Sequence, residues 1–476
     1  MRRRTSVTPR LVLALLALGV ALRGFHYLRD RAVWHDEAAV VVNVLSRGFG
    51  DLLGPLRFHE AAPPLFLWLL KATSLTLGDS SLSLRLPSFL AGVASLLLLA
   101  HVARRLLTPR AVPWAVLLFA ASEQLLWHAS EAKPYALDVL AATLVLAAYA
   151  WGLGRPPAQA LLAYALLAPP LIFLSYPACF LFGAVLVALL PAVWRRRQAG
   201  TWAAYGLLAA ATAVSFLLLL FGPVRAQHDP VIHADWASCM PCWQRPWSVP
   251  GWAVLSSLEV CRYCCKPLGQ ALAPLALVGA VALWRRGLRG WVVLLTLPVA
   301  LALLAACLHR YPYGGVRVLA YAAPAVVLLV AAGTPAALDW LRARARPAAA
   351  ALVLALLLPL GHTLWFAAFV WPEADVPSAA AYVVARRQAA DPVTGNDWTH
   401  LYYFRRLGPH FALANADAPQ PRERVWMVIT DMSPHEGRLD LARRMAPDGW
   451  RLQEDGNFAF TSVALFARDD LRRAAR

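Results

Sequence analysis

Long apolar runs constrain the fold of this chain more than any other feature of its sequence. A helix needs about 20 apolar residues to cross the hydrocarbon core of a bilayer, and runs near this length recur as far as residue 371. Hydrophobic residues make up 59% of the chain and charged residues 15%, which excludes a disordered chain and an ordinary soluble enzyme. The fold class predicted is a polytopic α-helical membrane protein. About eleven spans are expected, at roughly 11–28, 84–103, 111–127, 135–153, 158–175, 178–194, 202–222, 268–284, 290–308, 316–334 and 348–371.

The placement of the basic residues predicts how these spans are oriented. The formal net charge is +18, but the arginines gather in short clusters between apolar runs, so no nucleic-acid partner is predicted. With eleven spans every cluster falls on one side, which the positive-inside rule makes cytoplasmic. We therefore expect a multi-pass protein of the plasma (inner) membrane with a cytoplasmic N-terminus and a retained signal anchor. The clusters are Arg2–Arg4 with Arg10, Arg104/Arg105/Arg110, Arg195–Arg197, Arg285/Arg286/Arg289 and Arg342/Arg344/Arg346.

The first predicted outer loop, 29–83, opens on the carboxylate pair Asp36-Glu37. Charge at the mouth of a membrane domain is costly and is usually kept for a function. The alternative is a solvated pair or a helix N-cap. Segments 38–53 and 63–77 of the same loop are predicted to be short interfacial helices with their apolar faces toward the membrane.

Further polar residues in the outer loops are candidate metal ligands. His59 and Glu60 lie in the middle of the first loop, and their side chains suit a divalent cation such as Mg²⁺, Mn²⁺ or Zn²⁺. The alternative is that they cap the following Pro-led helix. In the second outer loop, Glu131 and Asp138 flank Lys133. Lys133 forms either a structural salt bridge with Asp138 or a phosphate contact, in which case Asp138 or Glu131 helps to hold a metal.

Two later outer loops carry motifs of their own. Cys239-x-x-Cys242 and Cys261-x-x-Cys264 have the spacing of a zinc ribbon, but disulfides are favoured in an oxidising compartment. Either would staple loop 223–267, and neither is catalytic. The loop 309–315 with its flank contains Arg310, Tyr311 and Arg317 beside a Gly pair. It is interpreted either as a phosphate clamp or as snorkelling arginines with interfacial tyrosines.

The composition changes after residue 371. The tail lacks a span-length apolar run and has strand-like stretches at 424–430 and 457–467, with helical patterns near 377–390 and 437–446. These predict two domains, a transmembrane domain over 1–371 and a small extracytoplasmic α/β domain over 372–476. The tail shows no catalytic signature, so recognition or a structural cover over the site is its expected role.

Together these motifs resemble the GT-C superfamily of membrane glycosyltransferases, and within it the protein O-mannosyltransferase and lipid A aminoarabinose transferase group. The resemblance covers residues 10 to about 335, and the Asp-Glu pair after the first span is its most specific part. Ala61 follows Glu60 where the aminoarabinose transferase pattern has Lys, so Lys133 and Arg317 would have to supply those phosphate contacts. The matching motifs are Asp36-Glu37, His59-Glu60-x-x-Pro63-Pro64, Glu131 to Asp138, and Tyr311-Pro312-x-Gly314-x-x-Arg317.

The resemblance implies an inverting transferase that moves one sugar from a polyprenyl phosphate of the undecaprenyl or dolichyl type. The acceptor would be a protein, lipid or glycan at the outer face of the membrane. Asp36 would be the general base or a metal-site carboxylate, and Glu37 its neighbour in the catalytic pair. Two other classes are open: a transporter or flippase for a lipid-linked sugar, and a non-enzymatic envelope assembly factor. The donor phosphate would be held by Lys133, Tyr135, Arg310, Tyr311 and Arg317.

Overall fold

The computed structural model describes residues 9–369, 373–414 and 423–468. The predicted Arg2–Arg4 cluster therefore lies outside the described residues. The chain divides into two compact units. The membrane unit comprises residues 1–29 and 48–369, and the sheet unit comprises residues 30–47 and 370–476. The segment that carries Asp36 thus belongs to the same unit as the C-terminal tail.

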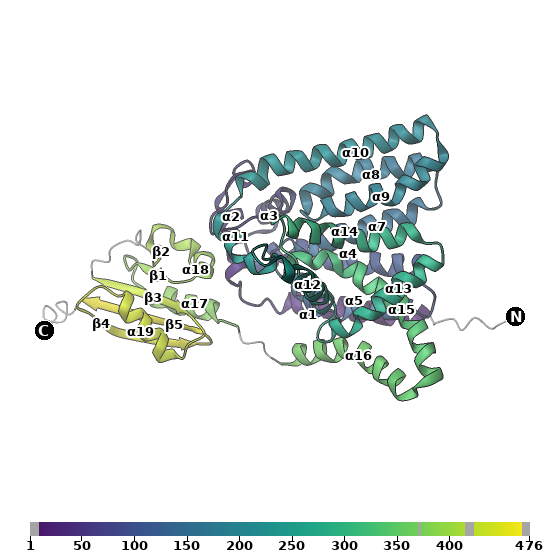
Figure 1. Ribbon diagram of the computed structural model, residues 1–476. Coiled ribbons are helices and arrows are strands. Elements are labelled where there is room, and N and C mark those ends of the chain that lie inside the picture. The colour runs from purple at the N-terminus through teal and green to yellow at the C-terminus, as the bar shows by residue number, and fades with distance from the viewer. Residues whose placement is uncertain (1–8, 370–372, 415–422, 469–476) are drawn as a thin grey trace. The chain divides into compact units, whose positions relative to one another are not determined.

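Apolar helices build the membrane unit, and the polytopic helical fold predicted from the sequence is confirmed. Within the described residues, nine helices are long and apolar enough to cross a membrane. A tenth span is present if α12 (Val249–Cys264) and α13 (Gly269–Arg285), which meet at a bend of 100°, are counted as one. Figure 1 shows α8, α9 and α10 running side by side. The nine are α1 (Pro9–Leu28), α4 (Ser81–Leu106), α7 (Tyr135–Gly152), α8 (Pro157–Leu174), α9 (Ala178–Arg196), α10 (Ala199–Leu219), α14 (Arg289–Cys307), α15 (Ala323–Arg344) and α16 (Arg346–Ala368).

The span predicted at 111–127 is broken into two short helices, neither of which is long enough to cross a bilayer by itself. α5 (Val112–Ala120) ends before Ser122, and α6 (Glu123–His128) follows it. The hydroxyl of Ser122 donates to the carbonyl of Cys264 at 3.1 Å. The buried guanidinium of Arg23 donates to the carbonyls of Phe119 at 3.3 Å and Ala120 at 3.5 Å. Carbonyls at a helix end need partners inside a membrane, and Arg23 supplies them at this break.

The two helices predicted in the first outer loop are both present. α3 (Pro64–Leu77) begins on a proline, which suits the first helical position because no N–H is needed there. With 14 residues it is too short to span a bilayer. α2 (His35–Ser46) is followed by a short 3₁₀ turn at Asp51–Leu53. α2 belongs to the sheet unit and α3 to the membrane unit.

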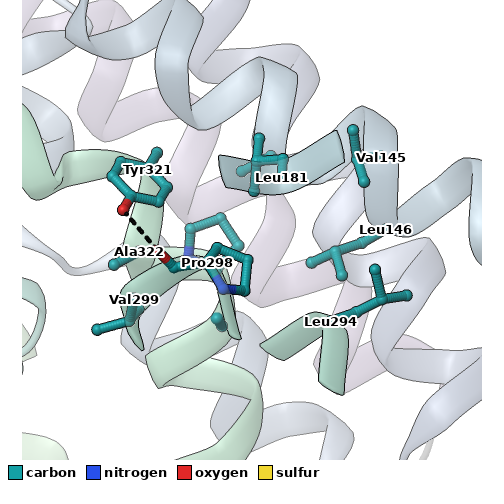
Figure 2. A pocket seen from close by; sticks show the side chains of 11 residues that line it. Val145, Leu146, Leu181, Leu294, Pro298, Val299, Tyr321 and Ala322 are labelled. Carbon is teal, nitrogen blue, oxygen red and sulfur yellow. Dashed lines mark hydrogen bonds between the residues drawn. The ribbon is translucent and has the colours of Figure 1, made fainter. Parts of the chain in front are cut away.

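One apolar region between helices of the membrane unit is tightly packed. Helices α7, α9, α14 and α15 meet around Leu181, Leu294 and Pro298, as Figure 2 shows. The free space there is about 10 Å³, at the lower limit of what one water molecule needs. The Tyr321 hydroxyl donates to the Pro298 carbonyl at 3.2 Å, so the polar atom in this apolar region is satisfied.

The sheet unit is a five-stranded mixed sheet with helices on both faces. The strand order is β2-β1-β3-β5-β4, with β1 parallel to β2 and β3, and β5 antiparallel to β3 and β4. Alternate residues of β3 face α17 on one side and α19 on the other, so the strand is apolar from Val425 to Ile429. The strands are β1 (Val393–Gly395), β2 (Phe411–Leu413), β3 (Arg424–Thr430), β4 (Trp450–Phe458) and β5 (Thr461–Arg468), and the helices of the tail are α17 (Val376–Arg386), α18 (Trp398–Tyr403) and α19 (His435–Met445).

The α/β character predicted for the tail is confirmed, with one difference in its strands. The predicted stretch 424–430 is β3, and the predicted helices correspond to α17 and α19. The stretch predicted as one strand at 457–467 covers the end of β4 and most of β5. A tight turn at Ala459-Phe460 separates them, with Phe460 in the left-handed region at φ 49°.

Two glycines set the closest helix contact in the membrane unit, between α13 and α15. A Cβ atom on Gly279 would lie 1.9 Å from the Leu329 carbonyl oxygen, and one on Gly333 would lie 2.1 Å from the Leu275 carbonyl oxygen. Small residues at such positions allow helix backbones to approach each other closely in membranes. The α13–α15 contact therefore depends on having glycine, which has no side chain, at both positions.

We predict that Gly333→Ala destabilises the protein, because α13 and α15 must separate to accept the methyl group. Overpacking of this kind typically costs about 1–3 kcal/mol. The midpoint of thermal unfolding in detergent should fall. Gly206→Ala in α10 is the matched control, since a Cβ atom there meets nothing within 4 Å. Equal midpoints for both variants would contradict the role of this contact.

Candidate functional site

A buried ion pair joins the first and second predicted outer loops within the membrane unit. Nζ of Lys133 lies 2.5 Å from Oε2 of Glu60, with side-chain exposures of 3% and 13%. The hydroxyl of Ser88 in α4 donates to the Lys133 carbonyl at 3.2 Å and fixes the backbone behind the ammonium group. Lys133 was predicted either to pair with Asp138 or to bind phosphate, and its partner is Glu60.

Tyr176 and Gln227 hold the backbone next to this ion pair. The Tyr176 hydroxyl lies 2.8 Å from both the Ala62 carbonyl oxygen and Oε1 of Gln227. The Ala62 amide donates to the same Gln227 oxygen at 3.0 Å. Burial, followed by the charges of Glu60 and Asp138, raises the pKa of Tyr176. The hydroxyl therefore remains a hydrogen-bond donor between two carboxylates at any physiological pH.

Asp138 lies in the first turn of α7, where it is 4% exposed. It is next to Ser175. Among the described residues, neither Oδ1 of Asp138 nor Oγ of Ser175 has a hydrogen bond of ordinary geometry. Buried polar atoms of native proteins nearly always have a partner, so this part of the site is suited to a polar ligand or to water.

Glu131 belongs to a satisfied network at the start of the same loop. Its Oε1 lies 2.5 Å from Nδ1 of His128, and its Oε2 accepts from the Trp127 indole at 3.1 Å. Nε2 of His128 lies 2.5 Å from the Tyr263 hydroxyl of α12. Both carboxylate oxygens are therefore occupied by protein donors. Glu131 fixes the loop between α6 and α7 to α12.

Aromatic rings surround Arg317, which is predicted to bind the phosphate of the sugar donor. Its guanidinium carbon lies 5.9 Å from the Tyr135 ring centroid and 5.7 Å from that of Trp236, within cation–π range. The Tyr311 hydroxyl donates to the Val318 carbonyl at 2.8 Å. Burial raises the pKa of Tyr311, and the nearby Tyr321 and Asp138 raise it further. Tyr135, Tyr311 and Arg317 are thus brought near Asp138.

Two of the predicted site residues, His59 and Arg310, lie outside this group. His59 is exposed, and its Nδ1 lies 2.7 Å from Oδ2 of Asp229. The hydrogen bond with His59 lowers the pKa of Asp229, which caps the short helix α11 (Pro230–Asp235) through the Val231 amide. Arg310 is exposed and forms no ion pair within the described part of the chain.

The four predicted metal ligands, Glu60, His59, Asp138 and Glu131, have different partners in the structure, and their role as ligands stays a prediction. Glu60 pairs with a lysine, His59 pairs with Asp229, and both oxygens of Glu131 are occupied. Within the described ranges, no three His, Cys, Asp or Glu side chains form a group able to hold a metal ion.

The cysteine motifs do not form the predicted staple. All seven cysteines lie in described residues and all are free thiols. Cys239 and Cys242 lie in the loop after α11, where Cys242 is exposed, whereas Cys261 and Cys264 lie one turn apart on α12 with Cys264 buried. The helix turns Cys264 into the core and away from the loop pair, so neither a zinc ribbon nor a disulfide is present among them.

The predicted catalytic pair lies in the first turn of α2, in the sheet unit. Carboxylates at this end of a helix interact favourably with its dipole. Asp36 is half-buried and Glu37 is buried.

α2 packs on α18, which belongs to the same unit. Nδ1 of His35 lies 2.9 Å from Oδ2 of Asp397, and the His35 ring stacks on Trp398 with centroids 4.0 Å apart. The Val33 amide donates to the Tyr403 hydroxyl at 2.8 Å. Burial opposes ionisation of Asp397, but hydrogen bonds from His35 and the Thr399 amide outweigh it and hold the pKa of Asp397 at about 2. The C-terminal domain therefore holds the residue next to Asp36.

Sequence reasoning missed the residues that support these charged groups. The sequence motifs do not point to Gln227 or to His128. A usable signal was the spacing of His128 and Glu131, which places both side chains on one face of a turn. Gln227 gave no such signal, because its partner Ala62 is 165 positions away.

Comparisons with known proteins agree with this architecture. Residues 61–219 match the family model described as dolichyl-phosphate-mannose-protein mannosyltransferase. This range includes Lys133, Asp138 and Tyr176. A search of curated proteins by sequence finds no match.

Solved structures of low sequence identity share the fold. The crystal structure of ArnT from Cupriavidus metallidurans bound to undecaprenyl phosphate is 13% identical, with a TM-score of 0.52 over 95% of this chain and 97% of that one. The Archaeoglobus fulgidus oligosaccharyltransferase in complex with Zn and sulfate is 12% identical, with a TM-score of 0.52 over 88% of this chain and 67% of that one. The chain therefore shares its fold with these two proteins, and its residues 61–219 are similar to the mannosyltransferase family model.

Proposed function

We propose that this protein transfers one sugar from a polyprenyl-phosphate donor, of the undecaprenyl or dolichyl type, to an acceptor hydroxyl at the outer face of the membrane. The observation that carries the proposal is the buried ammonium group of Lys133 at the end of a transmembrane helix bundle. It lies within the segment that matches the mannosyltransferase model. The ArnT structure of similar fold was solved with undecaprenyl phosphate bound.

The reaction needs a base, a positively charged group that neutralises the departing phosphate, and alignment of the two substrates. The acceptor oxygen forms a bond to the sugar C1 as the bond from C1 to the phosphate oxygen breaks. The phosphate leaves with the electron pair, and the acceptor proton passes to the base. A single displacement of this kind inverts the configuration at C1, by the logic of inverting glycoside chemistry.

Asp36 is proposed as the base. It is half-buried at the start of α2, where the carboxylate is held by a helix that packs on α18. A correctly placed general base typically contributes about 10²–10⁴-fold to a rate. Glu37 is buried in the same turn, and its proposed role is to position Asp36.

Lys133 and Arg317 are proposed to neutralise the departing phosphate. Lys133 supplies a point charge and Arg317 a planar group with several donors. Tyr135 lies beside Arg317 and is assigned to the same phosphate site, whereas the Tyr311 hydroxyl already donates to the Val318 carbonyl. We assign the neutralisation of the phosphate charge to these two cations. Arg310 is exposed and is left out of this role.

The proposed orientation is supported by the ends of the bundle. Arg110 forms two hydrogen bonds with Asp339, at 2.9 and 2.7 Å, which join the start of α5 to the end of α15. Two of the predicted arginine clusters therefore share one end of the membrane unit. Under the positive-inside rule this end is cytoplasmic, so we propose that Lys133 and the C-terminal domain face the outside.

We predict that Asp36→Asn abolishes sugar transfer, with a loss of roughly 10²-fold or more, because the amide cannot accept the acceptor proton. Transfer would be measured in membrane vesicles by mass spectrometry of the products. Asp51→Asn is the control, since Asp51 is a carboxylate of the first loop that only binds the Gly48 amide. Near wild-type transfer by the Asp36 variant would remove it from the mechanism.

Lys133→Met should weaken donor binding and lower transfer at least about tenfold, since the phosphate loses a charge-assisted contact. The substitution also leaves Glu60 buried without its partner, at a typical cost of about 3–5 kcal/mol. The double variant Glu60→Gln/Lys133→Met removes that cost, so its unfolding midpoint should recover while its transfer does not. Recovery of transfer together with stability would show that the pair is only structural. Lys71→Met in α3 is the control for loss of a lysine.

His35→Ala is predicted to lower kcat about tenfold or more without a matching rise in KM for the donor. The substitution removes the ring that connects α2 to Asp397 and Trp398. Asp36 can then shift from its position, and small displacements of a catalytic group lower the rate strongly. His435→Ala is the matched control, because Nε2 of His435 forms an equivalent pair with Asp455 at 2.9 Å elsewhere in the sheet unit. The assignment fails if both variants lose the same activity, or if His35→Ala keeps the wild-type kcat.

A further inference from the structure

A large cavity lies at the end of the membrane unit opposite Asp138. It has a volume of about 820 Å³ and opens between the C-terminal ends of α7 and α9 and the N-terminal ends of α8 and α14. Gly152 lines it, whereas Asp138 is fourteen residues earlier in the same helix. At a rise of 1.5 Å per residue the two are about 20 Å apart. The cavity is therefore separate from the proposed donor site.

Four arginines line this cavity: Arg155, Arg195, Arg196 and Arg289. Within the described residues, none of the four guanidinium groups forms an ion pair with a carboxylate. The sequence contains no Asp or Glu between Asp138 and Asp229, and none between Glu259 and Asp339. All four helix ends at the cavity come from these two stretches. These two stretches supply no negative charge to balance the four positive charges around the cavity.

Aromatic side chains place the cavity at the level of lipid head groups. Trp151, Trp194 and Trp284 end helices α7, α9 and α13 and are 43%, 61% and 49% exposed. Exposed tryptophans at helix ends mark the membrane–water interface. Arg155 lies over Trp151 at 4.1 Å and Arg289 over Trp284 at 5.2 Å, so the same rings orient two of the guanidinium groups.

The surface beside the cavity is suited to acyl chains. Leu162 and Leu166 of α8 are 43% and 79% exposed, and Val187 and Leu190 of α9 are 49% and 38% exposed. These residues lie on the helices that form the cavity, further along α8 and earlier along α9, toward the middle of the bundle. A ligand with an anionic head and apolar tails would match both surfaces.

We infer that this cavity binds the phosphate head group of an anionic membrane phospholipid. Arginine binds phosphate through several donors in one plane, and basic pockets between transmembrane helices are suited to anionic head groups. The arginines would then do more than set the orientation of the spans. The inference does not depend on the proposed sugar transfer.

The test uses the full chain, purified in a neutral detergent and reconstituted with phosphatidylcholine alone or with added phosphatidylglycerol. Bound lipid would be counted by native mass spectrometry, and the unfolding midpoint would be measured with each lipid. For the wild type we expect retained phosphatidylglycerol and a higher midpoint with it than with phosphatidylcholine. The double variant Arg195→Gln/Arg289→Gln should lower phosphatidylglycerol binding at least about tenfold.

Arg104→Gln/Arg105→Gln is the matched control, because it removes two exposed arginines of another cluster, at the end of α4. Its lipid binding should stay at the wild-type level. If the first variant does not fold in phosphatidylcholine, Arg155→Gln/Arg196→Gln provides the same comparison. Equal losses in the control and cavity variants would overturn the proposal, as would absence of retained phosphatidylglycerol. An equal rise in midpoint with inorganic phosphate alone would overturn the lipid as the source of the phosphate.

Discussion

Burying an ammonium group at the mouth of a transmembrane bundle is the constraint on which the candidate site depends. The ammonium group of Lys133 is paired there with Glu60, whose Oε2 lies 2.5 Å from Nζ, and the desolvation cost of such a pair is large. The surrounding hydrogen bonds serve to hold the two loops that carry it. Tyr176 and Gln227 fix the backbone next to Glu60, and Ser88 fixes that of Lys133. A separate network through His128 and Tyr263 fixes the start of the same loop.

The second constraint is that the predicted base is not part of the helical bundle. Asp36 lies on α2, and α2 belongs to the unit formed by the C-terminal sheet. His35, beside it, is held by Asp397 and Trp398. This gives the C-terminal domain a specific physical task, which is to orient the first turn of α2. Under the proposed function, a domain without a catalytic signature of its own would still be needed for the reaction.

The sequence was sufficient for features that depend on local pattern. Apolar run lengths predicted most of the spans, and the alternation and composition of 372–476 predicted an α/β domain. It was insufficient where the outcome depends on distant partners. The break at Ser122 is stabilised by Arg23, about a hundred residues earlier, and the partner of Lys133 is 73 positions away. The spacing of the cysteines suggested a staple, but α12 turns Cys264 into the core.

The central claim is that the protein consumes a lipid-linked monosaccharide to glycosylate an acceptor. The most direct measurement is mass spectrometry of polyprenyl-phosphate sugars and envelope glycoconjugates from cells with and without the gene. The account predicts that cells without the gene accumulate one polyprenyl-phosphate monosaccharide and lose that sugar from a glycoconjugate. Unchanged levels of both the lipid-linked sugars and the glycoconjugates would contradict it.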